Sequence, residues 1–191
     1  MANTTKAMYL VFTVVVGFMQ PATANAEPAP GGTVVTLQDL LSAPVPALCQ
    51  HDPGNLVNGI LPPQDSHPGQ VMIAKRNDQP DTPYKVAFGS LTGGHIIDAA
   101  MVTDCSAGGV PGSETIQLYT AGPTRLGGMN LGDITHSREV VTDLSIIDGL
   151  VHVNWLANAP GDAECCPSII WPATCVGTAS RASIENVRRL N

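Results

Sequence analysis

The residues of this sequence that could perform acid-base or nucleophilic chemistry lie closest together around His136. Asp133 stands shortly before this histidine and Ser137 directly after it. A serine, a histidine and a carboxylate are the groups of a hydrolase triad. Such triples arise by chance in most chains of this length, and no G-x-S-x-G turn occurs. We therefore assign no catalytic residue, and keep a secreted hydrolase that uses acidic residues or His136 as the alternative function.

The histidines show no spacing typical of a metal site. None lies three or four positions from another, as ligands on one helix face would, and no H-E-x-x-H occurs. The sequence predicts neither a metal nor a cofactor. The histidines are His51, His67, His95, His136 and His152.

The segment from Gly89 to Ala99 resembles the acidic calcium loops of FG-GAP-type repeats. Calcium needs about six or more oxygen ligands, several of them from carboxylates. Ser90, Gly94 and Ile97 stand where acids would be wanted, and only Asp98 remains. The interpretation that we favour is that Asp98 caps a turn.

Residues 1–26 have the layout of a secretory signal peptide. Lys6 precedes an apolar run from Ala7 to Met19, and Ala24-Asn25-Ala26 is a small-x-small cleavage site. The run is shorter than the roughly 20 residues that a transmembrane helix needs. No cysteine stands at the cleavage site to carry a lipid. We therefore expect a secreted, extracytoplasmic protein that is cleaved after Ala26 and is not lipidated.

The remaining chain is expected to hold a Pro/Gly-rich disordered leader, 27–35, and a single secreted domain, 36–191. The net charge of −7 argues against nucleic acid and against electrostatic docking on an anionic membrane. Glycine (19) and proline (16) are numerous enough to predict many turns and short elements. We expect no nucleic-acid partner and no transmembrane segment.

The strongest local signal is a hairpin around Asp148-Gly149, a two-residue loop of the type I′ kind between alternating runs. Apolar residues fall on one face and mainly polar ones on the other, as in an antiparallel sheet that is packed on one side. The expected register pairs Leu144 with Val153, Ile146 with Val151 and Thr142 with Trp155 on the apolar face, and Asp143 with Asn154 and Ser145 with His152 on the polar face.

The other elements are short. Thr36 to Leu41 is expected to be a helix with Thr36 as N-cap and Asp39 at N3, and Ala179 to Leu190 could be a helix or a strand. We predict a mainly β fold, with α+β as an alternative, built on an antiparallel sheet with short helices and stapled by disulfides. Further strands are expected at Val71–Lys75, Tyr84–Phe88, His95–Thr103, Thr115–Thr120 and Thr124–Leu131.

Five cysteines in an exported chain predict two disulfides and one cysteine left over. Adjacent Cys165 and Cys166 rarely bond to each other, because the small ring strains the peptide between them. We expect them to reach Cys49 and Cys105, in either of two connectivities. The alternative is that Cys105 is a buried free thiol. No C-x-x-C occurs that would indicate thioredoxin-like chemistry.

Several segments, taken in order, resemble exported actinobacterial proteins related to the mycobacterial LppP/LprE lipoproteins. The resemblance covers roughly Leu37 to Ile170, and its more specific parts are Cys105-Ser106-Ala107-Gly108-Gly109-Val110 and Cys165-Cys166-Pro167-Ser168. It implies a cell-envelope location and a disulfide framework of Cys49, Cys105, Cys165 and Cys166. Cys175 lies outside the matched segments, and we expect it to be the free thiol. The family implies no reaction. The function expected is a secreted or cell-envelope binding or structural module without enzymatic activity.

Overall fold

The computed structural model describes residues 33–64, 69–76, 83–107, 112–163, 166–178 and 181–189, and for 175–178 and 181–185 the backbone alone. The expected signal peptide, residues 27–32 of the leader and Cys165 lie outside this part of the chain. None of the helices that it describes is long and apolar enough to cross a membrane.

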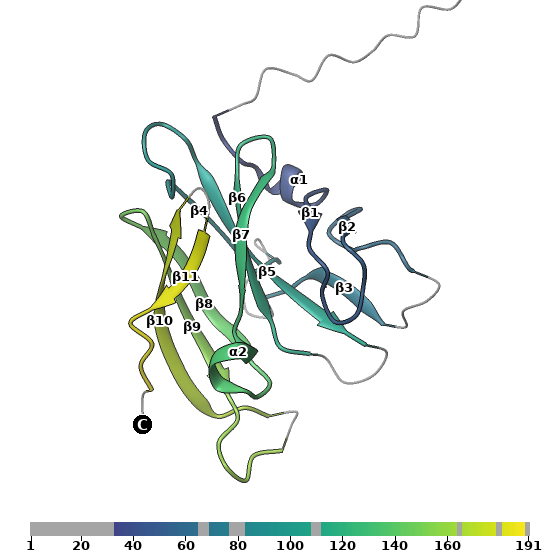
Figure 1. Ribbon diagram of the computed structural model, residues 1–191, viewed down its shortest axis with the longest axis vertical. Helices are drawn as coiled ribbons and strands as arrows, with labels where there is room; N and C mark the ends of the chain where they lie inside the picture. Colours follow the sequence, from purple (N-terminus) through teal and green to yellow (C-terminus); the bar gives the residue numbers. More distant parts are fainter. Residues whose placement is uncertain are drawn as a thin grey trace, which may run out of the picture.

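Two antiparallel sheets form the body of the protein (Figure 1). The first has the order β3-β5-β6-β7, with β4 also paired to β5, and the second has the order β11-β10-β9-β8. The strands of the first sheet are β3 (Gln70–Ile73), β4 (Val86–Gly89), β5 (Asp98–Ser106), β6 (Thr115–Thr120) and β7 (Thr124–Asn130). The strands of the second are β8 (Val140–Ile147), β9 (Leu150–Ala157), β10 (Ile169–Thr178) and β11 (Arg181–Glu185). The prediction of a mainly β, antiparallel fold is confirmed.

The sheets enclose one apolar core and meet along both sides, where β4 contacts β8 and β11 contacts β7. Trp155 is fully buried there and stacks on Trp171, with ring centroids 6.4 Å apart and an interplanar angle of 14°. These two indoles join β9 to β10 on the face that packs against the first sheet. Terminal residues 179–190, whose structure the sequence left open, include the strand β11.

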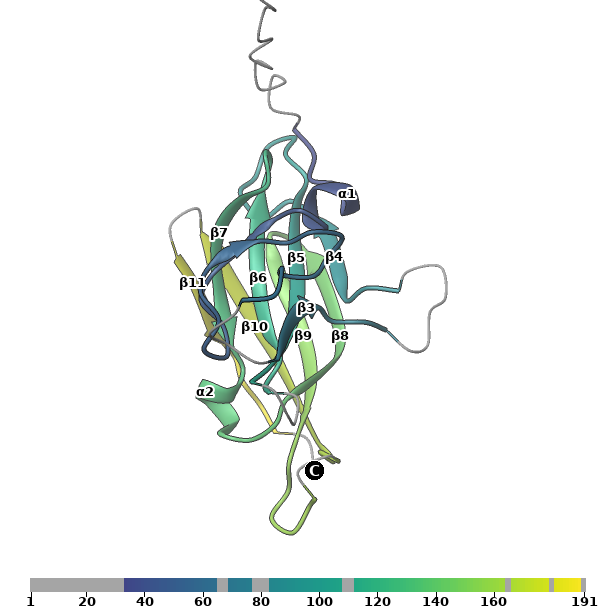
Figure 2. The same cartoon turned by 90° about the vertical axis from the view of Figure 1, so that its right-hand side faces the viewer.

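A second apolar cluster lies on the other face of the first sheet, the face that the N-terminal segment crosses in Figure 2. The N-terminal segment covers this face with the helix α1 (Leu37–Leu40) and the strands β1 (Pro44–Val45) and β2 (Gly54–Asn55). Tyr119 reaches from β6 into this layer, and its hydroxyl donates to the Pro44 carbonyl at 2.8 Å. Both faces of β5 are therefore covered, which explains the continuous apolar run in its sequence.

The start of α1 follows the prediction. Thr36 Oγ1 accepts from the Asp39 backbone N–H at 3.3 Å, and Asp39 Oδ2 accepts from the Thr36 N–H at 2.8 Å, which is a capping box. The folded part of the chain begins before residue 36, where we expected it to begin. Val35 is buried, and its N–H donates to the Ile97 carbonyl at 2.8 Å. Residues 33–35 thus belong to the folded domain.

The Asp148-Gly149 hairpin is confirmed, with φ of 51° and 78° at the two loop residues, as a type I′ turn requires. The register agrees with the expected one for four of its five pairs. The fifth is wrong, because a β-bulge at Thr142 places Val141 opposite Trp155. An extra residue in one strand cannot be read from alternation alone.

The expected disulfide connectivity is also wrong. Cys49 bonds to Cys105, with their Cα atoms 6.0 Å apart, so neither of them reaches Cys165 or Cys166. Cys49 and Gln50 take left-handed backbone angles (φ 46° and 71°) in a tight turn, which brings Cys49 to the end of β5. Cys166 is disulfide-bonded to a partner outside the described side chains, so the free thiol at Cys175 stays a prediction.

Candidate binding groove

The groove begins where the chain leaves the first sheet between β3 and β4. Both strands pair with the same edge of β5, β3 at Thr103–Ser106 and β4 at Asp98–Met101. At Val102, between these stretches, the N–H donates to the Lys85 carbonyl and the carbonyl accepts from the Ala74 N–H, both at 2.9 Å. This junction fixes Lys85 at the side of the first sheet that approaches β8.

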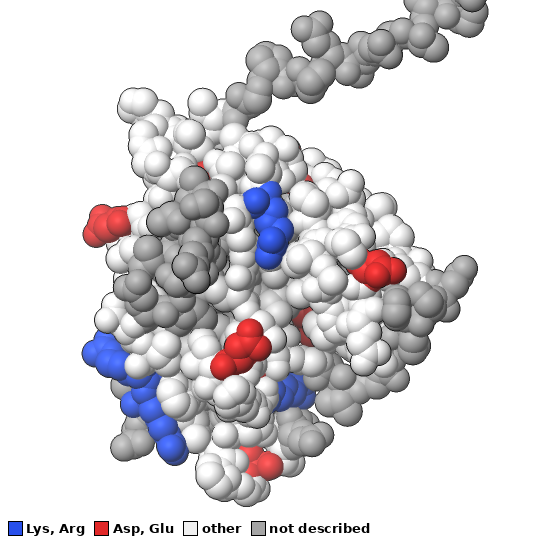
Figure 3. Space-filling view, viewed as in Figure 1, with Lys and Arg blue, Asp and Glu red and all other residues white. Residues whose placement is uncertain are grey.

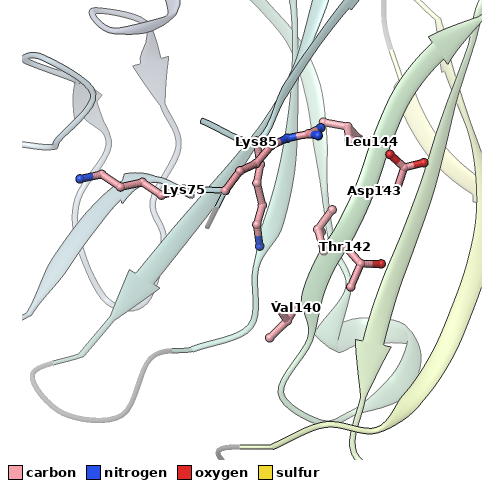
Figure 4. Close-up of a pocket in the computed structure, with 8 residues that line it drawn as sticks. Lys75, Lys85, Val140, Thr142, Asp143 and Leu144 are labelled. Carbon is pink, nitrogen blue, oxygen red and sulfur yellow. The ribbon is translucent and has the colours of Figure 1, made fainter. Parts of the chain in front are cut away.

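A hollow of about 300 Å³ separates this junction from β8 (Figure 4). One wall carries Lys75, Arg76 and Lys85, and the other is the stretch Val140–Leu144 of β8. A second hollow of about 270 Å³ shares Lys75, Lys85 and Val140 with the first and continues it. The second hollow is also lined by Met72, Asp104, Gly112, Glu114, Arg138 and Glu139. We call the two together the β8 groove.

The floor of the β8 groove holds an ion pair. Lys85 Nζ donates to Glu114 Oε1 at 2.6 Å and to Oε2 at 2.9 Å, and the two side chains are only 12 % and 10 % exposed. Glu114 Oε2 also accepts from the Val141 N–H at 2.5 Å. The carboxylate therefore ties the first sheet to the edge of the second, and protein donors occupy both of its oxygens.

Two carboxyls that line the β8 groove, Glu114 and Asp104, have pKa values shifted in the same direction. Burial raises the pKa of Glu114 above its ordinary value of 4.5, against the opposing effects of the Lys85 charge and of the hydrogen bonds from Lys85 and Val141. Burial also raises the pKa of Asp104, against the charges of Arg138 and Lys85. Burial thus destabilises the charged form of Glu114, and Lys85, through its positive charge, is the main group that offsets this destabilisation.

Replacing Lys85 by methionine should lower the free energy of unfolding by about 3 kcal/mol at neutral pH, because Glu114 is left buried without its counter-charge. The loss should depend on pH. Without Lys85 the pKa of Glu114 rises further, so the folded state binds the proton more tightly than the unfolded state, and stability falls as pH rises from the unfolded value of 4.5 to the folded one. Urea unfolding of the variant and the parent from pH 4 to pH 8 measures this.

Lys75→Met is the matched control for that experiment. Lys75 is exposed, points away from β8 (Figure 4) and has no acidic partner among the described residues. Its replacement should change stability by no more than about 0.5 kcal/mol. If the stability lost in Lys85→Met were the same at every pH from 4 to 8, Lys85 would act through packing alone.

The structure does not assemble the triad considered around His136. This residue ends the short helix α2 (Gly132–Thr135), with φ 52° and an exposed side chain. The Ser137 hydroxyl donates to Glu139 Oε1 at 3.2 Å, and Asp133 Oδ1 accepts from the Asn130 amide at 3.2 Å. The serine and the aspartate are thus engaged with groups other than the histidine.

The interpretation of Asp98 as a turn cap is confirmed. Its side chain is fully buried, and its Oδ2 accepts from the backbone N–H of Leu91 at 2.7 Å and of Thr92 at 2.8 Å, and from the Thr92 hydroxyl at 2.9 Å. These bonds fold the loop between β4 and β5. Among the described residues no group of three or more histidine, cysteine or acidic side chains could hold a metal ion.

The groove residues were not identified from the sequence, because they come from distant segments. One signal was present: Lys85 interrupts the apolar run Tyr84–Phe88, and a lysine inside such a strand needs a buried partner. Nothing in the sequence pointed to Glu114 as that partner.

Comparison with protein-family models, with curated proteins and with solved structures gave no match to this chain. The surface offers no broad charged patch on the face in Figure 3, where the visible charged residues are scattered among uncharged ones.

Proposed function

We propose that the protein is a secreted or cell-envelope binding module without enzymatic activity, and that the β8 groove is its binding site. The observation that carries this proposal is a hollow of about 300 Å³ whose neighbouring carboxylate, Glu114, is already engaged by protein donors. Glu114 is occupied by Lys85 and Val141, whereas Lys75 and Arg76 have no acidic partner among the described residues. The groove therefore offers a ligand both cations and carboxylates, including the buried Glu139 Oε2, which has no hydrogen-bond partner.

The same features disfavour catalysis. A general acid or base must exchange a proton with the substrate at hydrogen-bond distance, and Glu114 accepts from Lys85 and Val141 instead. The raised pKa values of Glu114 and Asp104 favour the hydrolase alternative. His136 does not line either hollow of the groove.

A fragment screen by nuclear magnetic resonance tests the proposal. The nitrogen-15-labelled secreted protein is titrated with N-acetyl dipeptides, short dicarboxylates and monosaccharides. We expect at least one class to shift the amide signals of Val140–Leu144 and Lys85 while the probe itself stays intact. Conversion of a probe to product, or shifts confined to the surroundings of His136, would contradict the proposal and favour the hydrolase.

The proposed location rests on the expected processing of the N-terminus. Intact-mass analysis of protein exported by an actinobacterial host should give a chain that starts at Glu27 with no added lipid mass. The reasons are the Ala24-Asn25-Ala26 site and the lack of a cysteine there. A start more than a few residues away, or a diacylglycerol mass, would refute this expectation.

A further inference from the structure

Three side-chain oxygens gather around Gly132, the first residue of α2. A Cβ atom added to this glycine would lie 2.9 Å from Ser113 Oγ, 3.2 Å from Asn130 Oδ1 and 3.3 Å from Glu139 Oε2. The three oxygens come from separate parts of the chain, before β6, at the end of β7 and before β8. They face one point that only a glycine leaves uncovered. We call them the Gly132 cradle.

Glu139 supplies the carboxylate oxygen of the cradle. Its side chain is fully buried, and its Oε1 accepts from the Ser137 backbone N–H at 2.9 Å and from the Ser137 hydroxyl at 3.2 Å. The other oxygen, Oε2, lies toward Gly132, where it is buried and has no hydrogen-bond partner. No described cation forms an ion pair with Glu139. A buried acceptor without a donor is costly, so this oxygen calls for a group from outside the described chain.

The other two cradle residues have no hydrogen to give to the carboxylate. The Ser113 hydroxyl donates its one hydrogen to the Ser137 carbonyl at 2.9 Å. The Asn130 amide nitrogen donates to Asp133 Oδ1 at 3.2 Å, and its oxygen accepts from the Gly132 N–H at 3.1 Å. The oxygen of Asn130 is therefore the atom that faces the cradle. All three cradle atoms act as acceptors toward the point that they share.

Acceptor oxygens that converge without a hydrogen between them are suited to a hard cation. Calcium takes roughly six to eight oxygens from carboxylates, amide carbonyls and water in a flexible arrangement, whereas magnesium demands a near-ideal octahedron. Three unlike oxygens from three segments therefore favour calcium. Asn130 and Asp133 are exposed, so water reaches the site and can complete the coordination. The cradle holds one acidic residue, and so differs from the clusters of acidic, histidine and cysteine side chains considered above.

We propose that the Gly132 cradle binds a calcium ion through Glu139 Oε2, Asn130 Oδ1 and Ser113 Oγ. The ion stabilises the segment by which the chain passes from β7 in the first sheet to β8 in the second. With a single carboxylate, its dissociation constant belongs at the weak end of protein calcium sites, about 0.1–1 mM. Glu139 also lines the second hollow of the β8 groove, but the inference goes beyond the proposed function, because the ion binds without a groove ligand.

Thermal unfolding of the full secreted protein tests the proposal, with calcium chloride as the probe. Relative to EDTA in sodium chloride of equal ionic strength, about 10 mM calcium chloride should raise the unfolding midpoint by about 3 °C or more. The reason is that a ligand of the folded state alone stabilises that state by mass action. Magnesium chloride at the same concentration should raise the midpoint less. In nuclear magnetic resonance spectra, calcium should shift the amide signals of Ser113, Gly132 and Glu139.

Two variants remove the site in different ways. Glu139→Gln replaces the carboxylate by an amide, and should reduce the calcium-dependent rise to less than about 1 °C. Gly132→Ala keeps the carboxylate but places a Cβ atom 2.9 Å from Ser113 Oγ, so it should also abolish the rise. Asp162→Asn is the matched control. Asp162 also closes a loop, where it accepts from the Ala159 N–H at 2.7 Å, but it lies outside the cradle, so this variant should keep the parent's rise.

The inference is overturned if calcium does not raise the parent's midpoint, since water would then satisfy the cradle. It is equally overturned if Glu139→Gln keeps the full rise, which would place the ion elsewhere. Should a variant fail to fold, the amide shifts of the parent decide, and calcium shifts that avoid Ser113, Gly132 and Glu139 would exclude the site. None of these results touches the proposed function, because the fragment screen reads the amides of Val140–Leu144 and Lys85.

Discussion

Replacing Val153 by aspartate should destabilise the protein by about 5 kcal/mol or more, because a carboxyl group would enter an apolar interior with no partner. Val153 is 1 % exposed and lies in the core between the sheets, opposite Leu144 and beside Trp155. Urea unfolding of the variant at neutral pH measures the loss, and a chain that fails to fold under native conditions agrees with the expectation.

Ser145→Asp is the control on the opposite face of the same hairpin. Ser145 is half-buried, pairs with His152 and is not part of either apolar cluster. The new carboxylate can reach solvent, so we expect a loss of less than about 1 kcal/mol. Similar losses in the two variants would mean that the faces of β8 and β9 are assigned wrongly.

The hairpin was predictable because the residues that determine its turn and its register lie next to one another in the sequence. Asp148-Gly149 selects the turn, and strict alternation on both sides selects the register. The same holds for α1, where Thr36 and Asp39 lie within one turn of each other. The bulge at Thr142 was missed because alternation along a strand does not show where one strand carries an extra residue.

The strand β10 was missed for a different reason. Pro172 lies inside it, and a proline usually excludes a central strand position, since it has no N–H to donate. Here β11 pairs with β10 only from Thr174 onward, so one side of Pro172 is an edge. The Pro172 carbonyl accepts from the Arg188 N–H at 3.0 Å, so the C-terminal segment covers that edge in place of a strand.

The β8 groove could not be predicted, because its parts are far apart in the chain. Lys85, Glu114 and Val141 meet only when β4, β6 and β8 are in place. Each residue taken alone is an ordinary member of a short strand or turn. What makes the site is the junction at Val102, where two strands share one edge of β5 and direct Lys85 toward the second sheet.

Opening the Cys49–Cys105 bond should cost about 4 kcal/mol of stability in the chain-entropy model, since the bond closes a loop with a sequence separation of 56. The variant Cys49→Ala/Cys105→Ala should unfold at lower urea concentration. It should also show a larger dependence of the free energy on urea, because the unfolded chain without the link exposes more surface.

A double-mutant cycle makes this expectation specific. Cys49→Ala alone, Cys105→Ala alone and the double variant open the same loop, so the three losses should be similar and the two single losses should not add. Cys105 is buried near Gly112, and its own packing should add only a small further loss to the variants that lack it. Additive losses would mean that the two cysteines act separately. Peptide mapping that joins either of them to any other cysteine would contradict the Cys49–Cys105 bond.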